Sequence, residues 1–81
     1  MNALIYTKDN CTFCVQAKHL MASNNVSFKE VKIGSDMVVE DFKSLFPDQR
    51  TVPLVFVDGQ RIGGFAELKE YFDNKPLLLE E

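Results

Sequence analysis

The chain has few of the residues that mark metal sites, nucleic-acid interfaces or membrane spans. It contains two cysteines and one histidine, whereas a structural zinc site takes four ligands. The net charge is −3, which argues against a nucleic-acid-binding surface, because such a surface requires clustered Lys and Arg. No apolar run approaches the roughly 20 residues that cross a membrane. We therefore expect no metal, and neither nucleic acid nor membrane as a partner.

The N-terminus also lacks the basic segment of a signal peptide, because it passes directly into a strand-like pattern. We therefore expect a cytoplasmic protein. With 81 residues, the chain is long enough for one domain only. We expect that domain to span residues 1–81, with a core over about residues 3–74 and a short tail over residues 75–81.

Strand-like and helix-like segments alternate along the chain. Apolar and β-branched runs predict strands over residues 3–7, 26–33, 54–57 and 60–62, with Asp58-Gly59 as a hairpin turn between the last two. Helical spacing of apolar residues predicts helices over residues 12–24, 39–46 and 65–72. The segment Gly34-Ser35-Asp36 offers a break and two N-cap candidates for the second helix. The order β-α-β-α-β-β-α predicts an α/β fold with a four-stranded mixed sheet and helices on both faces.

The segment Cys11-Thr12-Phe13-Cys14 holds both cysteines and lies between the first predicted strand and the first predicted helix. A Cys-x-x-Cys pair in this position is typical of a thiol redox site. We expect Cys11 to be the nucleophile, because the free N–H groups of a helix start and the nearby Lys8 favour a thiolate. These effects would lower the pKa of its thiol below the free value of about 8.5. Cys14, one turn further, is the expected shielded, resolving thiol.

Zinc binding is the alternative interpretation of the two cysteines. His19 is the only other good ligand candidate in the sequence. It lies five residues past Cys14 and therefore points away from the helix face that carries this cysteine. The number of available ligands favours the redox interpretation.

Four short motifs follow one another along the chain. They are Tyr6-Thr7-Lys8-Asp9-Asn10-Cys11-Thr12-Phe13-Cys14, Arg50-Thr51-Val52-Pro53, Phe56-Val57-Asp58-Gly59 and Ile62-Gly63-Gly64. In this order and spacing the chain resembles the glutaredoxins, the glutathione-linked branch of the thioredoxin fold, over roughly residues 3–74. Its short length, Thr12 and the closing helix are most similar to phage-encoded glutaredoxins. The resemblance implies a thioredoxin fold and a redox-active Cys11–Cys14 disulfide, in a monomer of the cytoplasm, or of the host cytoplasm if phage-encoded.

The resemblance also implies an enzyme, a glutathione-dependent thiol–disulfide oxidoreductase. Such an enzyme reduces protein disulfides and glutathione mixed disulfides, with glutathione as the reducing co-substrate. Ribonucleotide reductase is one protein client that the family suggests. The glutathione-binding residues implied are Lys8, Phe13, Gln49, Thr51, Val52, Pro53, Gly64, Phe65 and Ala66.

Each part of glutathione has an expected partner in that set. The resemblance implies a cis bond before Pro53, which would expose the Val52 backbone to glutathione as to an added strand. Pro53 could also serve only to begin a strand. The glycyl carboxylate would meet Lys8 and Gln49, with Arg50 nearby. The γ-glutamyl carboxylate would meet the backbone N–H groups of residues 64–66 at the start of the last helix.

Ala66 departs from the family pattern. Many glutaredoxins have an acidic residue there, which faces the γ-glutamyl ammonium, so we expect weaker glutathione binding. Two other functions stay open on this basis. One is a glutaredoxin-like redoxin reduced by thioredoxin reductase, a group that also lacks the acid and carries Phe after the glycine. The other is a [2Fe–2S] carrier that uses Cys11 with glutathione as a further ligand.

Overall fold

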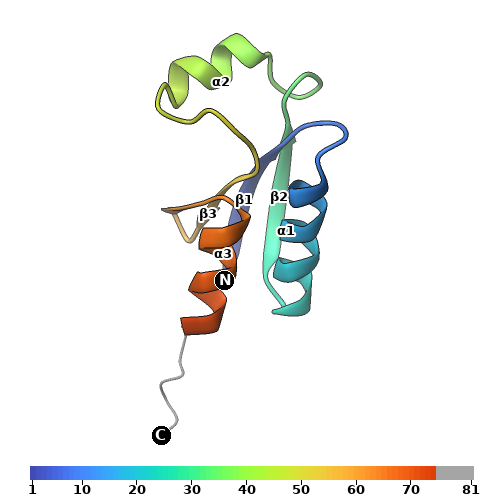
Figure 1. Cartoon of the computed structure of the whole chain (residues 1–81), viewed down its shortest axis with the longest axis vertical. Helices are drawn as coiled ribbons and strands as arrows, with labels where there is room; N and C mark the ends of the chain where they lie inside the picture. The colour runs from blue at the N-terminus through green and yellow to red at the C-terminus, as the bar shows by residue number, and fades with distance from the viewer. Residues whose placement is uncertain (75–81) are drawn as a thin grey trace, which may run out of the picture.

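The computed structural model describes residues 1–74, so the predicted tail over residues 75–81 lies outside the described residues. The strands are Asn2–Thr7 (β1), Ser27–Lys32 (β2), Leu54–Val57 (β3) and Gln60–Gly63 (β4). The helices are Thr12–Ser23 (α1), Val39–Leu45 (α2) and Phe65–Asn74 (α3) (Figure 1). Every predicted element is present, with ends that differ by two residues at most. None of these helices has the length and apolar character needed to cross a membrane.

The four strands form one mixed sheet in the order β2-β1-β3-β4. The inner strand β1 pairs with β2 in parallel, with Thr7 opposite Lys32, and with β3 in antiparallel orientation. The turn between β3 and β4 has positive φ at both Asp58 (50°) and Gly59 (84°), as a two-residue hairpin turn requires. The predicted mixed sheet with an antiparallel hairpin at its edge is confirmed.

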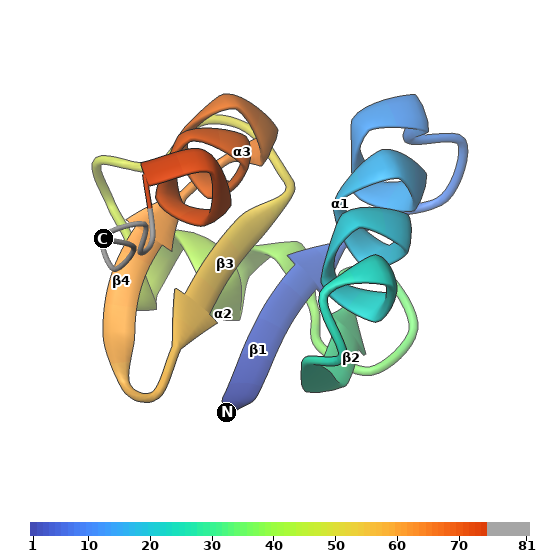
Figure 2. The ribbon, with the colours of Figure 1, turned by 90° about the horizontal axis from the view of Figure 1, so that it is seen from below.

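The helices lie on both sides of the sheet, with α1 and α3 on one face and α2 on the other (Figure 2). Successive side chains of a strand point to opposite faces. Ile5 and Val55 accordingly belong to the apolar cluster under α1 and α3, whereas Tyr6 and Leu54 belong to the cluster under α2. The two inner strands are apolar on both faces because both faces are covered.

The first cluster fixes α1 and α3. The inner face of α1 carries Cys14, Ala17 and Met21, and each of the three is almost fully buried. Leu68 of α3 is buried to the same extent. Full burial of a side chain such as Met or Leu contributes about 1.5–3 kcal/mol to stability. This packing fixes the helix that begins at the two cysteines.

The second cluster fixes α2 through aromatic rings in tilted and edge-on contact. The ring of Tyr6 lies 5.4 Å from that of Phe42 and 5.3 Å from that of Phe46, measured between centroids. Phe56 of β3 closes the group at 5.7 Å from Phe46. Such ring pairs are favourable beyond the area that they bury. They hold α2 against the sheet face opposite α1.

The prediction for the N-cap of α2 was wrong. Val38 occupies that position and makes no side-chain cap hydrogen bond. Asp36, one of the two candidates, instead accepts the backbone N–H of Lys32 through Oδ2 at 3.0 Å. Asp36 thus closes the turn after β2. It is not the N-cap of α2, because two further residues separate it from Val39, the first residue of that helix.

Asn10 makes the turn between β1 and α1. Its φ of 57° lies in the left-handed region, which asparagine tolerates better than most residues other than glycine. The turn places Cys11 at the N-cap of α1, close to the end of the inner strand.

We expect Asn10→Val to lower the free energy of unfolding by about 1–2 kcal/mol, because a β-branched residue is strained in this backbone conformation. Asn10→Gly should cost much less, since glycine adopts positive φ freely. Urea unfolding of the oxidised proteins measures both values. Equal losses in the two variants would show that the backbone conformation at this position is not what stabilises the turn.

Candidate active site

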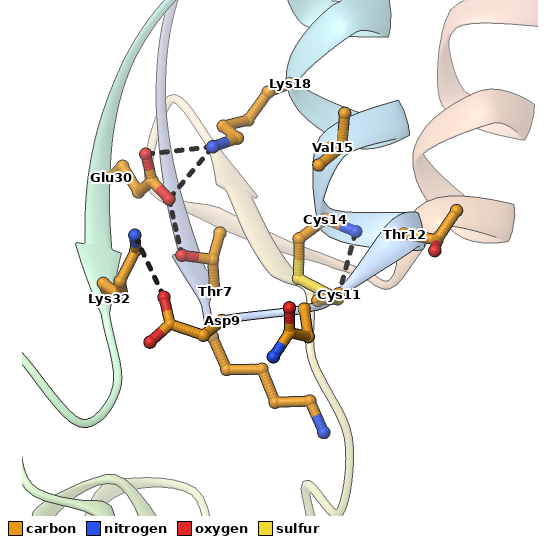
Figure 3. A pocket seen from close by; sticks show the side chains of 11 residues that line it. Thr7, Asp9, Cys11, Thr12, Cys14, Val15, Lys18, Glu30 and Lys32 are labelled. Atoms are coloured by element: carbon orange, nitrogen blue, oxygen red, sulfur yellow. Dashed lines mark hydrogen bonds and ion pairs between the residues drawn. A yellow bond between two sulfur atoms is a disulfide. The ribbon is translucent and has the colours of Figure 1, made fainter.

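Cys11 and Cys14 form a disulfide at the start of α1, with their Cα atoms 5.2 Å apart (Figure 3). Cys11 is partly exposed, whereas Cys14 is only 2% exposed. An incoming sulfur can therefore reach Cys11 but not Cys14. This difference is the one expected between a nucleophile and a shielded resolving thiol.

The sulfur of Cys11 is itself the cap of α1. Its Sγ accepts the backbone N–H of Cys14 at 3.1 Å, a contact that an oxygen of Ser, Thr, Asp or Asn typically makes at a helix N-cap. A donor aimed at the sulfur and the positive end of the helix dipole both stabilise negative charge there. The carbonyl oxygen of Val52 lies 3.8 Å from the same Sγ, so the loop before β3 borders the reactive atom.

Two neighbouring cavities lie near the disulfide, and Cys11 lines the first of them. One, of about 880 Å³, lies between the cysteine loop, α2 and the loop before β3, and we call it the α2 cavity. The other, of about 400 Å³, lies between the loop before β3 and the start of α3, and we call it the α3 cavity. Phe13, Thr51 and Val52 line both cavities, so the two spaces adjoin at these three residues.

All nine residues predicted to bind glutathione line these cavities. Lys8 and Gln49 line the α2 cavity, Pro53, Gly64, Phe65 and Ala66 line the α3 cavity, and Phe13, Thr51 and Val52 line both. The bond between Val52 and Pro53 is cis, as the resemblance implied. The structure thus brings together residues from three separate motifs of the sequence.

The start of α3 presents fewer free donors than the sequence analysis assumed. The N–H of Gly64 donates to Oε1 of Glu67 at 2.9 Å, which is a cap within the helix itself. The N–H groups of Phe65 and Ala66 have no hydrogen-bond partner among residues 1–74. The ring of Phe65 stacks on Phe13, with centroids 6.0 Å apart and planes 28° apart. An anion in the α3 cavity would therefore meet two free N–H groups beside an aromatic pair.

Arg61 is a residue near the site that the sequence analysis missed. Its guanidinium donates to Oε1 of Gln49 at 2.8 Å and pairs with Asp48 at 3.3 Å. The Gln49 amide nitrogen in turn donates to the Thr51 carbonyl at 2.9 Å and keeps a second proton for a ligand. Arg61 thus orients Gln49 in the wall of the α2 cavity. No local sequence signal identifies it, because the contact joins β4 to the loop before β3.

A third cavity, of about 430 Å³, lies on the other side of the disulfide and is lined by both cysteines (Figure 3). In its wall the Thr7 hydroxyl donates to Oε2 of Glu30 at 2.6 Å. The ammonium of Lys18 contacts both oxygens of the same carboxylate, at 3.1 and 3.2 Å. Sequence analysis missed this group, although Lys18 lies four residues after Cys14 and therefore on the same side of α1.

Glu30 is held in its ionised form by these contacts. The hydrogen bond from Thr7 is the main cause that lowers the pKa of Glu30 below its usual value. Lys18, through its hydrogen bond and its charge, and Lys32, through its charge, lower this pKa further, against an opposing effect of burial. The charges of Lys18, Glu30 and Lys32 on this side of the disulfide are thus paired within the protein.

Residues 1–74 contain no group of three or more Cys, His, Asp or Glu side chains that could hold a metal ion. His19 is exposed on the outside of α1. In this part of the chain, the zinc interpretation therefore has no set of ligands.

Comparison with known proteins identifies the relatives of the chain. The family model described as glutaredoxin matches residues 3–62. Glutaredoxin 3 of Escherichia coli K12 is 39% identical over 67 residues, which cover 83% of this chain and 81% of that protein. A hybrid peroxiredoxin of Haemophilus influenzae is 38% identical over 68 residues, which cover 84% of this chain but only 28% of that longer protein. The crystal structure of a buckwheat glutaredoxin–glutathione complex shares the thioredoxin-like fold, with a TM-score of 0.73 at 25% identity, over 89% of this chain and 68% of that one.

The Glu30 contacts predict a specific pH dependence of stability. A carboxylate whose pKa is lowered by folding stabilises the folded state above its unfolded pKa of about 4.3, and this stabilisation is lost as the pH falls through the folded value. Glu30→Gln should therefore be less stable than the wild type at pH 6, by an amount that shrinks towards pH 3. Urea unfolding across this range measures the difference. Glu70→Gln removes an exposed carboxylate without these contacts and is the matched control; the same pH-dependent difference there would contradict the assignment.

Proposed function

The chain belongs to the glutaredoxin family of thiol–disulfide oxidoreductases, and we propose that it reduces protein disulfides and glutathione mixed disulfides with electrons from glutathione. One arrangement carries the proposal: Cys11 lines the α2 cavity, which shares Phe13, Thr51 and Val52 with the α3 cavity. A tripeptide with its sulfur beside Cys11 has one cavity available for each of its two arms.

The lining of the cavities suits the three parts of glutathione. The N–H of Val52 has no partner among residues 1–74, and with its carbonyl it can pair with the cysteinyl backbone as a strand edge does. The glycyl carboxylate would meet the ammonium of Lys8 and the amide of Gln49 in the α2 cavity. The γ-glutamyl carboxylate would meet the free N–H groups of Phe65 and Ala66 at a helix N-terminus. The buckwheat relative was crystallised as a glutathione complex, which supports glutathione as the ligand.

In the first step the Cys11 thiolate attacks one sulfur of the substrate disulfide. A bond forms between Cys11 Sγ and that sulfur, the substrate S–S bond breaks, and the leaving sulfur departs as a thiolate with the electron pair. This thiolate takes a proton from water. The Cys14 N–H and the helix dipole stabilise the attacking thiolate, because both act at the Cys11 sulfur.

The mixed disulfide on Cys11 can then be resolved in two ways. A glutathione thiolate can attack the bound glutathione sulfur, which yields glutathione disulfide and restores the Cys11 thiolate. Alternatively Cys14 loses its proton to water and attacks Cys11 Sγ, which releases the second substrate thiol and closes the disulfide seen in the structure. Two glutathione molecules reduce that disulfide and leave as glutathione disulfide, so electrons and protons balance.

We also propose that the protein acts as a monomer in the cytoplasm and that ribonucleotide reductase is among its clients. The sharpest test of the reductant compares glutathione plus glutathione reductase with thioredoxin reductase, each acting on the oxidised protein. Fast reduction by glutathione supports the proposal. Reduction by thioredoxin reductase alone would instead identify a glutaredoxin-like redoxin, the function that Ala66 leaves open.

The two cysteines should separate the two activities. Cys11→Ser should abolish every thiol transfer, because it removes the attacking sulfur. Cys14→Ser should lose reduction of protein disulfides but keep deglutathionylation, which needs one thiol only. Steady-state assays with a glutathionylated protein and with a protein disulfide measure the two activities. Loss of both activities in both variants would contradict the assigned roles.

Ala66 should limit the affinity for glutathione. Ala66→Asp adds a carboxylate beside the γ-glutamyl ammonium, and such solvent-exposed pairs are worth about 1 kcal/mol or less, which is under tenfold in affinity. Calorimetry measures the dissociation constant of S-methylglutathione, a thioether analogue of glutathione. Ala66→Asp should lower this constant relative to the wild type, and more so at low salt than at high salt. Ala66→Asn is the matched uncharged control. A gain of equal size for Asn and Asp would show that charge is not the cause.

A further inference from the structure

The α2 cavity has a wall that the proposed glutathione site does not use. Val39, Phe42 and Lys43 of α2 line the cavity, on the side opposite the loop before β3. Glutathione is assigned to Lys8 and Gln49 in this cavity and otherwise extends into the α3 cavity. The α2 wall therefore remains available to a larger substrate whose sulfur reaches Cys11.

Charge is distributed unevenly around this cavity. Among residues 1–74, Lys8, Lys29, Lys43 and Arg50 have no carboxylate partner, and all of these except Lys29 line the α2 cavity. No Asp or Glu side chain lines the cavity, although the chain has 12 acidic residues and a net charge of −3. A cavity with unpaired cations in an acidic protein favours an anionic occupant.

Exposed apolar side chains also line the α2 cavity. Phe13 is 59% exposed and Val39 is 43% exposed, and both line the cavity. Val38, directly before α2, is 56% exposed. Apolar and cationic groups that meet at a disulfide suit a polypeptide, which brings apolar, acidic and sulfur-containing side chains together. A nucleic acid has the charge but no sulfur for Cys11.

We propose that the α2 cavity docks acidic segments of client proteins, in which Asp or Glu side chains lie close in sequence to the disulfide that is reduced. The acidic side chains would meet Lys43 and Arg50, and an apolar neighbour would contact Val39, while the client sulfur reaches Cys11. This inference rests on the proposed exchange at Cys11 and adds to it the class of protein disulfide that is preferred.

The test uses single turnover, so that glutathione takes no part in it. The full-length protein is reduced with dithiothreitol, freed of the reagent and mixed with disulfide-bonded peptides of one length. One peptide carries three Asp or Glu residues near its disulfide, and the other carries Asn or Gln in their place. The variant Lys43→Glu tests the wall of the cavity. Lys29→Glu is the matched control, because it makes the same change of charge at an exposed, unpaired lysine on β2, outside the cavity.

We expect the wild type to reduce the acidic peptide about tenfold faster than the amide peptide at low salt, and the preference to fall as salt is added. Lys43→Glu should lower this preference about fivefold, in keeping with the modest strength of solvent-exposed charge pairs. Lys29→Glu should keep the wild-type preference. Circular dichroism of both variants checks that they fold.

Three results would overturn this inference alone. Equal rates for the two peptides in the wild type would show that acidic residues are not recognised. An equal loss of preference in Lys29→Glu and Lys43→Glu would assign the effect to net charge. Inhibition by a short DNA oligonucleotide as strong as that by the reduced acidic peptide would indicate a general anion site. Failure to reduce either peptide would instead contradict the exchange at Cys11 itself, and this inference with it.

Discussion

The inner strand β1 is the element on which the other parts of the structure depend. It pairs with β2 along one edge and with β3 along the other, and its side chains are buried alternately under both layers of helices. Ile5 and Tyr6 belong to different clusters, so a slip of one residue would exchange the two layers and is strongly disfavoured. The end of β1 is therefore fixed in space. The turn at Asn10 then places Cys11 at the start of α1, where its sulfur accepts a helix N–H.

The two sides of the disulfide differ in how charge is arranged. Behind it, Lys18 pairs with Glu30 and Lys32 with Asp9, and Lys8 is the one cation lining the cavity there for which no ion pair forms within residues 1–74. On the exposed side, Lys43 and Arg50 have no such partner among residues 1–74 and line a cavity without carboxylates. This asymmetry leaves attraction for anions on the side where a substrate sulfur can approach. It is compatible with glutathione and with acidic protein segments, which both carry negative charge.

Much of the fold could be predicted from local patterns. Alternating or continuous apolar runs identified the strands, apolar residues at helical spacing identified the helices, and Asp58-Gly59 identified the hairpin. The Cys-x-x-Cys segment indicated which sulfur would be exposed, because its place between a strand and a helix defines the helix start. The N-cap of α2 could not be predicted in this way. Several polar residues precede that helix, and only the closure of the turn after β2 decided that Asp36 would bond to Lys32.

The sequence by itself determined the order of the elements, the two reactive sulfurs and the residues that the family motifs assign to glutathione. Only the tertiary structure decided that Thr7 and Lys18 hold Glu30 behind the disulfide, that Arg61 holds Gln49, and which cations stay without partners. The reason is physical. Element type depends on neighbours within about four residues, which a sequence displays directly. Ion pairs and cavity walls depend on strand register and helix packing, which join residues far apart in the chain.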